Sequence, residues 1–206
     1  MQSIQNKVLA RIRGKGRGYA FSSKEFLDLG NRNSVDKALS RLCAHRIIRR
    51  VVTGIYDFPR TDQELGGKLS PDIHQVAHAI ARKNGVRIQP SGAQAANLLG
   101  ISTQVPAKVV YLTNGKSRTV NVANRTLLFK RVEPREMQPG SEIGFLVTQA
   151  LRYMGREKVG INVIEYLRRL LTDSDRKKLL KEARYMEDWI WESVRSIASK
   201  QEQSGE

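Results

Sequence analysis

Cysteine and long apolar runs are scarce in this chain of 206 residues, and each shortage excludes a class of protein. The single cysteine, Cys43, rules out an internal disulfide and a metal site built from several cysteines. No apolar run approaches the roughly 20 residues that a membrane-spanning helix needs, and the N-terminus lacks the continuous apolar stretch of a signal peptide. We therefore expect a cytoplasmic protein without a membrane partner.

Patterns that bind nucleotides or metals are also scarce. The sequence GKGRG at 14–18 is not followed immediately by a helix or preceded by a strand, so it does not predict a phosphate-binding loop. His74 and His78 are spaced as i and i+4, which can hold a metal, but neither an HExxH glutamate nor an obvious third ligand accompanies them. We expect no cofactor and no metal site.

Nucleophiles and paired carboxylates give no stronger signal for catalysis. Cys43 lies beside the apolar stripe of a predicted helix and lacks a patterned histidine partner, which favours a small packed residue over a nucleophile. Carboxylates such as Glu133 and Glu136 cannot be paired into an acid–base site from the sequence. The sequence thus predicts a protein that is not an enzyme.

Acidic residues are few, and the resulting positive charge is the most informative property of the composition. Thirty-six Lys and Arg against 20 Asp and Glu give a net charge of +16. Residues 1–58 carry 12 basic and 4 acidic side chains, and residues 59–140 carry 12 and 5, whereas residues 141–206 carry 12 and 11. Such an excess attracts polyanions, either nucleic acid or a membrane surface, and a membrane surface would require a basic amphipathic helix with bulky apolar residues opposite. The distribution of charge places the polyanion-facing surface in the first two thirds of the chain and leaves the balanced last third for packing or a protein partner.

The first 58 residues have the pattern of a winged helix-turn-helix. Apolar positions predict a helix from Ile4 to Gly14, a short second helix in SSKEFLDLG capped by Ser22 or Ser23, and a third helix capped by Asn33 or Ser34. Two β-rich runs around Thr53-Gly54 then predict a hairpin. In this arrangement the third helix enters the major groove and the hairpin touches the flanking backbone. A small helical domain with merely solvated charges, or a protein-interaction module, is the alternative.

The exposed basic and polar side chains of this region are the candidate DNA-binding residues. Those predicted to approach bases are Arg32, Asn33, Ser34, Lys37 and Arg41. Those predicted to contact phosphates are Arg11, Arg13, Lys15, Arg17, Arg49 and Arg50, with Thr53 in the hairpin turn.

A second, α+β region is predicted after a polar linker. Ser70 as N-cap, Pro71 at the first helical position and Asp72 in the first turn open a predicted helix that ends at Gly85. A short strand, VRIQP, and a small-residue helix from Ser91 to Gly100 follow. Asn114-Gly115 between two strand-like runs predicts a tight hairpin, and TLLFKRV predicts a third strand of a small antiparallel sheet.

The last third of the chain predicts three helices joined by short links, a helical bundle. Their apolar stripes begin at Ile143, at Val163 and at Leu179, and Thr172 with Asp175 is expected to start one long final helix. We expect these stripes mainly to close a core; a partner or dimer surface near Trp189 or Trp191 is the alternative.

The segment PSGAQAANLLGISTQVPAKVVYLTNG, after a region ending in TGIYDFP, resembles the Abi E antitoxin family. The similarity runs from about residue 3 to about residue 135, and its specific part is Pro90, Ser91, Gly92, Ala95, Ala96, Leu99, Gly100, Val105, Pro106, Tyr111, Leu112, Thr113, Asn114 and Gly115. The resemblance implies a repressor that binds inverted repeats in its own promoter and an antitoxin that neutralises a nucleotidyltransferase-like toxin of an abortive-infection system. It places no toxin-neutralising residue.

These observations predict an α+β protein in which a winged helix-turn-helix precedes a small antiparallel-sheet domain with a C-terminal helical bundle. The predicted boundaries are 1–58 for the DNA-binding domain, 59–70 for the linker, 71–200 for the second domain (71–135 sheet part, 141–200 helical part) and 201–206 for a frayed tail. The predicted partners are double-stranded DNA, a possible toxin and a possible second copy of the chain. The alternatives are a stand-alone winged-helix regulator without a toxin, or an accessory subunit of a nucleic-acid-processing enzyme.

Overall fold

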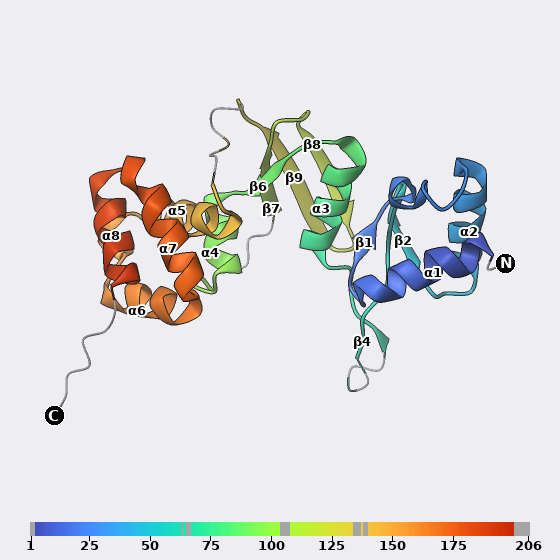
Figure 1. The fold of residues 1–206 in the computed structure, drawn as a ribbon, viewed down its shortest axis with the longest axis horizontal. Coiled ribbons are helices and arrows are strands. Elements are labelled where there is room, and N and C mark those ends of the chain that lie inside the picture. Colours follow the sequence, from blue (N-terminus) through green and yellow to red (C-terminus); the bar gives the residue numbers. More distant parts are fainter. Residues whose placement is uncertain are drawn as a thin grey trace. The chain divides into compact units, whose positions relative to one another are not determined.

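The chain folds as a mixed α+β protein, shown in Figure 1. The computed structural model describes residues 3–62, 64, 67–103, 108–133, 137 and 140–199. Two compact units form, one from Met1–Ile88 with Ala107–Arg131 and the other from Gln89–Pro106 with Val132–Glu206. We call them the N-terminal unit and the helical unit.

The N-terminal unit begins with two helices, a 3₁₀ turn and a three-stranded sheet. Their bounds are α1 (Ile4–Lys15), β1 (Ala20–Phe21), η1 (Ser23–Phe26), α2 (Arg32–Ala44), β2 (Arg49–Val52) and β3 (Ile55–Asp57). The antiparallel sheet has the order β1-β3-β2, and the predicted Thr53-Gly54 turn joins β2 to β3 with Gly54 at φ 72°. Buried side chains of α1, η1 and α2, including Ile12, Phe26 and Leu39, pack into one core with Phe21 of β1.

Three local predictions for this segment need correction. The second helix is a 3₁₀ helix of four residues, although the backbone N–H of Ser22 does donate to Glu25 Oε1 at 3.0 Å as a capping box requires. The third helix starts earlier than predicted because Asn31 is its N-cap: Asn31 Oδ1 accepts from the Ser34 amide at 2.9 Å. Strand β1 was not predicted, since two residues carry no detectable alternation.

Helix α3 (Ile73–Asn84) joins this segment to the part of the unit that follows. Ile73, Val76, Ala77, Ala79 and Ile80 are all buried, so α3 is apolar around most of its circumference. It contacts β1 and β3 as well as β9, and its side chains share one core with Ala20 and Ile55. Its N-cap is Asp72, whose Oδ1 accepts from the amide of His74 at 2.9 Å, not Ser70 as predicted; Gly85 ends the helix as expected.

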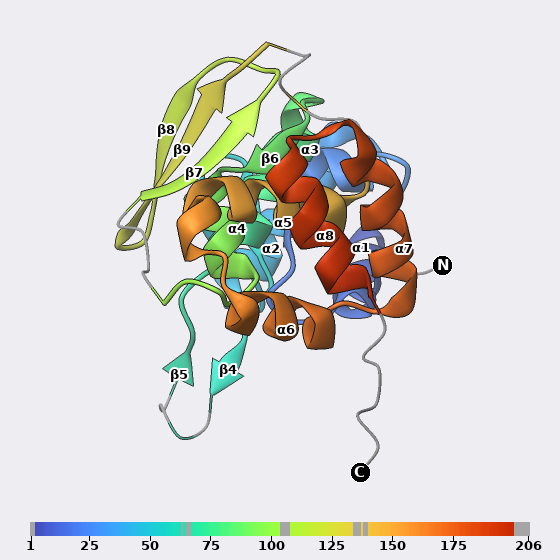
Figure 2. The same ribbon diagram turned by 90° about the vertical axis from the view of Figure 1, so that its left-hand side faces the viewer.

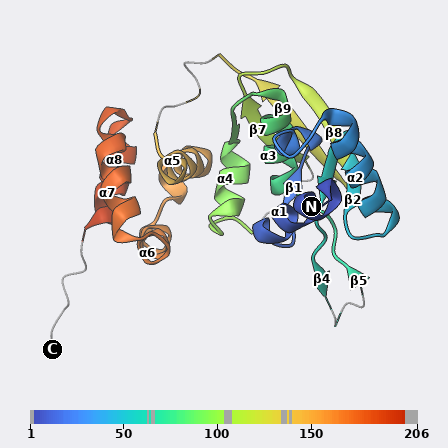
Figure 3. The ribbon, with the colours of Figure 1, turned by 45° about the vertical axis from the view of Figure 1, so that its right-hand side comes forward.

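The segment predicted as a linker contains a small antiparallel pair of strands, β4 (Thr61–Asp62) and β5 (Gly67–Lys68). Figures 2 and 3 show this pair extending away from the neighbouring elements of the N-terminal unit. Arg60 and Asp72 flank it and form an ion pair at 3.0 Å. The pair therefore precedes α3 as an ordered ribbon rather than as a free spacer.

The second sheet is mixed, which corrects the predicted antiparallel sheet. Its strands are β6 (Ile88–Pro90), β7 (Lys108–Thr113), β8 (Arg118–Val122) and β9 (Arg125–Arg131), in the order β6-β7-β9-β8. Strand β9 lies between β7 and β8, parallel to β7 and antiparallel to β8. The predicted hairpin at Asn114-Gly115 is therefore wrong; the hairpin joins β8 to β9 through Ala123 (φ 49°) and Asn124.

Packing explains why the Asn-Gly turn does not close a hairpin. The parallel register places Val109 beside Leu127 and Tyr111 beside Phe129, so that buried side chains of β7 and β9 are neighbours on one face. Asn114 is used elsewhere: its Oδ1 accepts from the amide of Arg87 at 2.8 Å. Local turn propensity is overridden by the tertiary burial of β9.

The helical unit contains α4 (Gly92–Leu98), α5 (Glu142–Met154), α6 (Ile161–Leu170), α7 (Asp173–Glu182) and α8 (Asp188–Ala198), with the 3₁₀ turns η3 (Arg156–Lys158) and η4 (Ala183–Tyr185). Figure 2 shows α7 and α8 side by side, with α6 across their ends. The predicted long final helix is broken at η4, so α7 and α8 are separate helices. Thr172 caps α7 with Asp175, as predicted.

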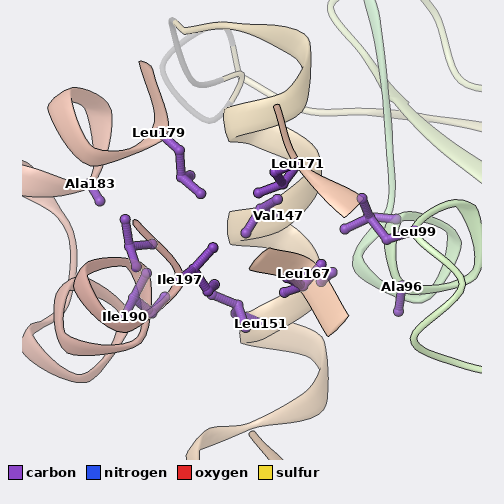
Figure 4. Packing of buried hydrophobic residues seen from close by; sticks show 13 residues of the cluster. Ala96, Leu99, Val147, Leu151, Leu167, Leu171, Leu179, Ala183, Ile190 and Ile197 are labelled. Atoms are coloured by element: carbon purple, nitrogen blue, oxygen red, sulfur yellow. The ribbon is translucent and has the colours of Figure 1, made fainter. Parts of the chain in front are cut away.

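Apolar stripes of α4 to α8 converge on one core, drawn in Figure 4. Leu151, Leu167, Leu179, Ile190 and Ile197 are fully buried there. The stripes therefore close a core, which was the favoured interpretation, and Trp189 and Trp191 pack against it while half-buried.

These two units divide the chain differently from the predicted boundaries. The predicted first domain and the predicted sheet part contribute to one core through α3, while α4 packs with the C-terminal helices. Residues 201–206 lie outside the described residues.

Candidate nucleic-acid interface

Helix α2 separates a buried apolar face from an exposed polar one. Val35, Ala38, Leu39 and Leu42 are buried in the N-terminal core, at the spacing of one helix face. The other face exposes the positions Arg32, Asn33, Lys37, Ser40 and Arg41. The predicted outward positions of this helix are thus exposed except Ser34, which is half-buried.

The exposed side chains of α2 differ in how far they are already bound. Arg32 Nε lies 2.8 Å from Asp36 Oδ2, an exposed i,i+4 pair, and Ser34 is half-buried with its amide on Asn31. Within the described parts of the chain, no ion pair involves Lys37 or Arg41, which stand one turn apart. These two cations are the best placed on α2 to meet an anionic ligand.

Arg49 and Arg50 at the base of the hairpin have opposite environments because successive strand residues face opposite sides. The Arg49 guanidinium lies 2.6 Å from Asp57 Oδ2 and donates to the carbonyl oxygen of Leu69 at 3.1 Å. The side chain of Asp57 is only 2% exposed, so this pair belongs to the interior. Arg50 is exposed, and Thr53 is exposed at the turn.

The basic residues of α1 and the following loop also divide into bound and open side chains. Arg11 forms two hydrogen bonds of 2.7 Å to Asp28, and this guanidinium lowers the pKa of the Asp28 carboxyl group. Arg17 donates to the carbonyl oxygen of Pro59 at 2.9 Å and lies over the Phe58 ring. Arg13 and Lys15 are exposed.

Further cations, which were not among the predicted site residues, lie at the same surface. Lys83 Nζ, at the end of α3, donates to the carbonyl oxygen of Thr53 at 3.0 Å. Partial burial lowers the pKa of Lys83, and the positive charges of Arg118, Arg32, Lys24 and Arg50 lower it further. The positive charges of these four side chains, from η1, α2, β2 and β8, therefore act on Lys83, although Asp36 pairs with Arg32.

One signal in the sequence could have found them. Between Asp72 and Glu133 there is no acidic residue, but there are nine basic ones: Arg82, Lys83, Arg87, Lys108, Lys116, Arg118, Arg125, Lys130 and Arg131. The Arg82 side chain is exposed but already engaged within the unit. It donates to the carbonyl oxygen of Ala20 at 2.7 Å and lies 3.4 Å from Glu25.

The residues considered for metal binding or catalysis have structural surroundings. His74 Nδ1 lies 2.8 Å from Tyr111 Oη, and the His78 ring meets Tyr111 edge-on. In the described part of the chain, no three His, Cys, Asp or Glu side chains are grouped so that they could hold a metal ion. Cys43 is half-buried against the N-terminal core, and burial raises the pKa of its thiol. Glu133 is exposed, and Glu136 lies outside the described residues.

The segment that resembles the Abi E family is split between the two units. Ala95, Ala96 and Leu99 are buried in the core of the helical unit, whereas Tyr111 and Thr113 are buried in the N-terminal unit. Val105 and Pro106 lie outside the described residues. The buried members of the segment therefore have a packing role.

Comparison with known sequences identifies a family. Residues 7–179 match the profile of a family of unknown function, DUF6088. The chain belongs to this family. The matched residues include parts of both units, from α1 to α7, and end before α8. Curated proteins give no match. No helix among the described residues is long and apolar enough to cross a membrane.

Proposed function

We propose that this protein binds double-stranded DNA through a winged helix-turn-helix and represses transcription. The order α1, η1, α2 and the β2–β3 hairpin is that of this motif, with α2 as the helix for the major groove. The three-stranded sheet β1-β3-β2 supports the hairpin. The observation that carries the proposal is the exposed face of α2, where Lys37 and Arg41 have no ion-pair partner among the described residues.

Within this interface we assign base contacts to Asn33, Lys37 and Arg41, and phosphate contacts to Arg50 and Arg13. Side chains of the first group project from the face of α2 opposite its buried stripe. Arg11 and Arg49 receive a structural role instead, because Asp28 and Asp57 already engage their guanidinium groups. Arg49 must give up its pair with a buried carboxylate before it binds a phosphate, which is costly. The Arg11–Asp28 pair is exposed and is the weaker of the two obstacles.

The test compares DNA binding of the wild-type protein and of Lys37→Ala combined with Arg41→Ala. The probes are a labelled duplex from the region upstream of its own gene and a scrambled duplex of equal length. We expect the wild type to bind the first at least about a thousandfold more tightly, and the double variant to lose most of that preference.

The matched control is Lys177→Ala combined with Lys181→Ala. These two exposed lysines have the same i,i+4 spacing on α7, in the helical unit, so the control removes the same charge. Equal binding of the wild type to both duplexes would contradict sequence-specific repression. An unchanged preference in Lys37→Ala/Arg41→Ala would remove α2 as the reading helix.

We further propose, on the resemblance to the Abi E family, that the repressor is the antitoxin of a nucleotidyltransferase-like toxin. The helical unit, whose charges nearly balance, is the part suited to a protein partner. If a gene for such a toxin lies beside this one, co-expression should restore growth that the toxin alone arrests. A protein that binds its promoter but gives no rescue would be a stand-alone regulator.

A further inference from the structure

We infer that the DNA-binding surface extends beyond the winged helix onto the end of α3 and the start of β8, where Lys83 and Arg118 contact phosphates of double-stranded DNA. This inference rests on the proposed function. It adds residues from the α+β part of the N-terminal unit, which the helix-turn-helix pattern does not include.

Hydrogen bonding places Lys83 at the hairpin turn. Its Nζ donates to the carbonyl oxygen of Thr53 at 3.0 Å, and a Cβ atom at Gly54 would lie 2.5 Å from that nitrogen. The absence of a side chain at Gly54 therefore leaves room for the ammonium group. Lys83 and the tip of the hairpin form one continuous surface, so a duplex that touches the hairpin meets Lys83 as well.

Strand β8 reaches the same surface from the other sheet. Strands β2 and β8 are in contact, and Val51, Val52 and Val120 pack against one shared core. Arg118, the first residue of β8, is exposed and its guanidinium lies 5.8 Å from the centre of the Phe129 ring. This cation–π contact is at the long end of its range, and the exposed guanidinium has hydrogen-bond donors to offer an acceptor such as a phosphate.

At this surface Asp36 pairs with Arg32. Among the described residues, no ion pair involves Lys83 or Arg118, and the carboxylates of Glu25, Asp28, Asp57 and Asp72 pair with other arginines. The stretch that contains Lys83 and Arg118 has no acidic residue. Like charges from Arg118 and Arg32 also disfavour the protonated form of Lys83, after burial. A phosphate between these cations would relieve their repulsion.

A hollow of about 300 Å³ lies next to Arg118, on the side that Lys116 rather than Lys83 lines, and Ile80, Val86 and Phe129 form its apolar wall. It lies between the end of α3, the start of β8 and the loop that precedes β8. Lys116 and Arg118 both line it. Asn84 and Thr113 add polar atoms, and none of the lining residues is acidic. The backbone of a nucleic acid fits this surface because its charges repeat along the duplex.

The test measures the salt dependence of DNA affinity for Lys83→Gln combined with Arg118→Gln. The probes are the upstream duplex and the scrambled duplex, with fluorescence anisotropy as readout. Loss of two phosphate contacts should weaken binding to both duplexes by a similar factor and lower the slope of log K against log[salt] by about 2. Lys177→Ala/Lys181→Ala again serves as the charge-matched control.

Arg118→Gln alone is the second variant, because Lys83 also holds the hairpin turn and its loss could disturb that turn. It should lower the slope by about 1, with an unchanged far-UV spectrum. A wild-type slope and affinity in both variants would overturn the inference, while the Lys37→Ala/Arg41→Ala result still decides the proposed function. A wild-type protein that binds neither duplex would overturn both.

Discussion

At the scale of single residues, the ion pairs of the N-terminal unit sort its many arginines into two groups. Arg11, Arg49 and Arg82 hold elements together through Asp28, Asp57 and Glu25. Lys37, Arg41 and Arg50 are exposed. The net positive charge of the sequence therefore overstates the number of cations available to a ligand. The ion pairs seen in the structure show which arginines are already engaged.

His74 gives a prediction for pH at this scale. Burial is the main cause that lowers the pKa of His74 below its ordinary value of 6.5, and its Nδ1 contacts the hydroxyl of Tyr111. The unfolded chain therefore binds the proton more readily than the folded one. Above pH 6.5 the imidazole is neutral in both the folded and the unfolded chain, so it does not lower the unfolding free energy. As the pH falls below 6.5, the unfolded chain takes up the proton first and the unfolding free energy decreases.

We expect His74→Gln to flatten the decline in unfolding free energy between about pH 7 and about pH 5. Urea unfolding followed by far-UV circular dichroism at both pH values measures it. The control is His45→Gln, since His45 is exposed after α2. If His74→Gln declines as steeply as the wild type, His74 does not titrate on unfolding in this range.

At the scale of elements, the mixed sheet depends on a turn that the sequence pattern did not indicate. Ala123 adopts a left-handed conformation, φ 49°, in the loop between Val122 and Arg125. An alanine there is strained by roughly 1–2 kcal/mol, which glycine avoids. Part of the gain is offset because glycine makes the unfolded chain more flexible.

Ala123→Gly is therefore expected to raise the unfolding free energy by about 0.5 kcal/mol. The comparison is Ala10→Gly, at an exposed position inside α1, which should lower it by about 1 kcal/mol. Both are measured by urea unfolding. Destabilisation by Ala123→Gly would mean that the β8–β9 turn does not have the left-handed geometry described.

At the scale of the whole molecule, the two units have separate cores although the chain passes between them three times. The core of the helical unit contains no residue of the N-terminal unit, and the reverse also holds for the described residues. Both tryptophans, Trp189 and Trp191, pack against the helical core. Tryptophan fluorescence thus reports the unfolding of the helical unit alone.

Leu151→Ala should lower the stability of the helical unit by about 2–5 kcal/mol, because Leu151 is fully buried and its truncation leaves a cavity. We expect the fluorescence-detected unfolding midpoint to fall while the affinity for the upstream duplex stays at the wild-type value. Leu39→Ala, in the core beneath α2, should weaken DNA binding without moving the fluorescence midpoint. A parallel loss of both properties in either variant would show that the units fold as one.

What the sequence by itself determined is local: amphipathic helices, the Thr53-Gly54 turn and the exposed face of α2 follow from periodicity, turn chemistry and capping over a few residues. Tertiary structure decided the rest. It inserted β9 between β7 and β8, made α3 a helix shared by two sheets, and paired Arg49 with a buried carboxylate. These outcomes depend on which residues far apart in the chain pack together or form ion pairs. A pattern over neighbouring residues indicates that a side chain is buried, but it does not identify its distant partner.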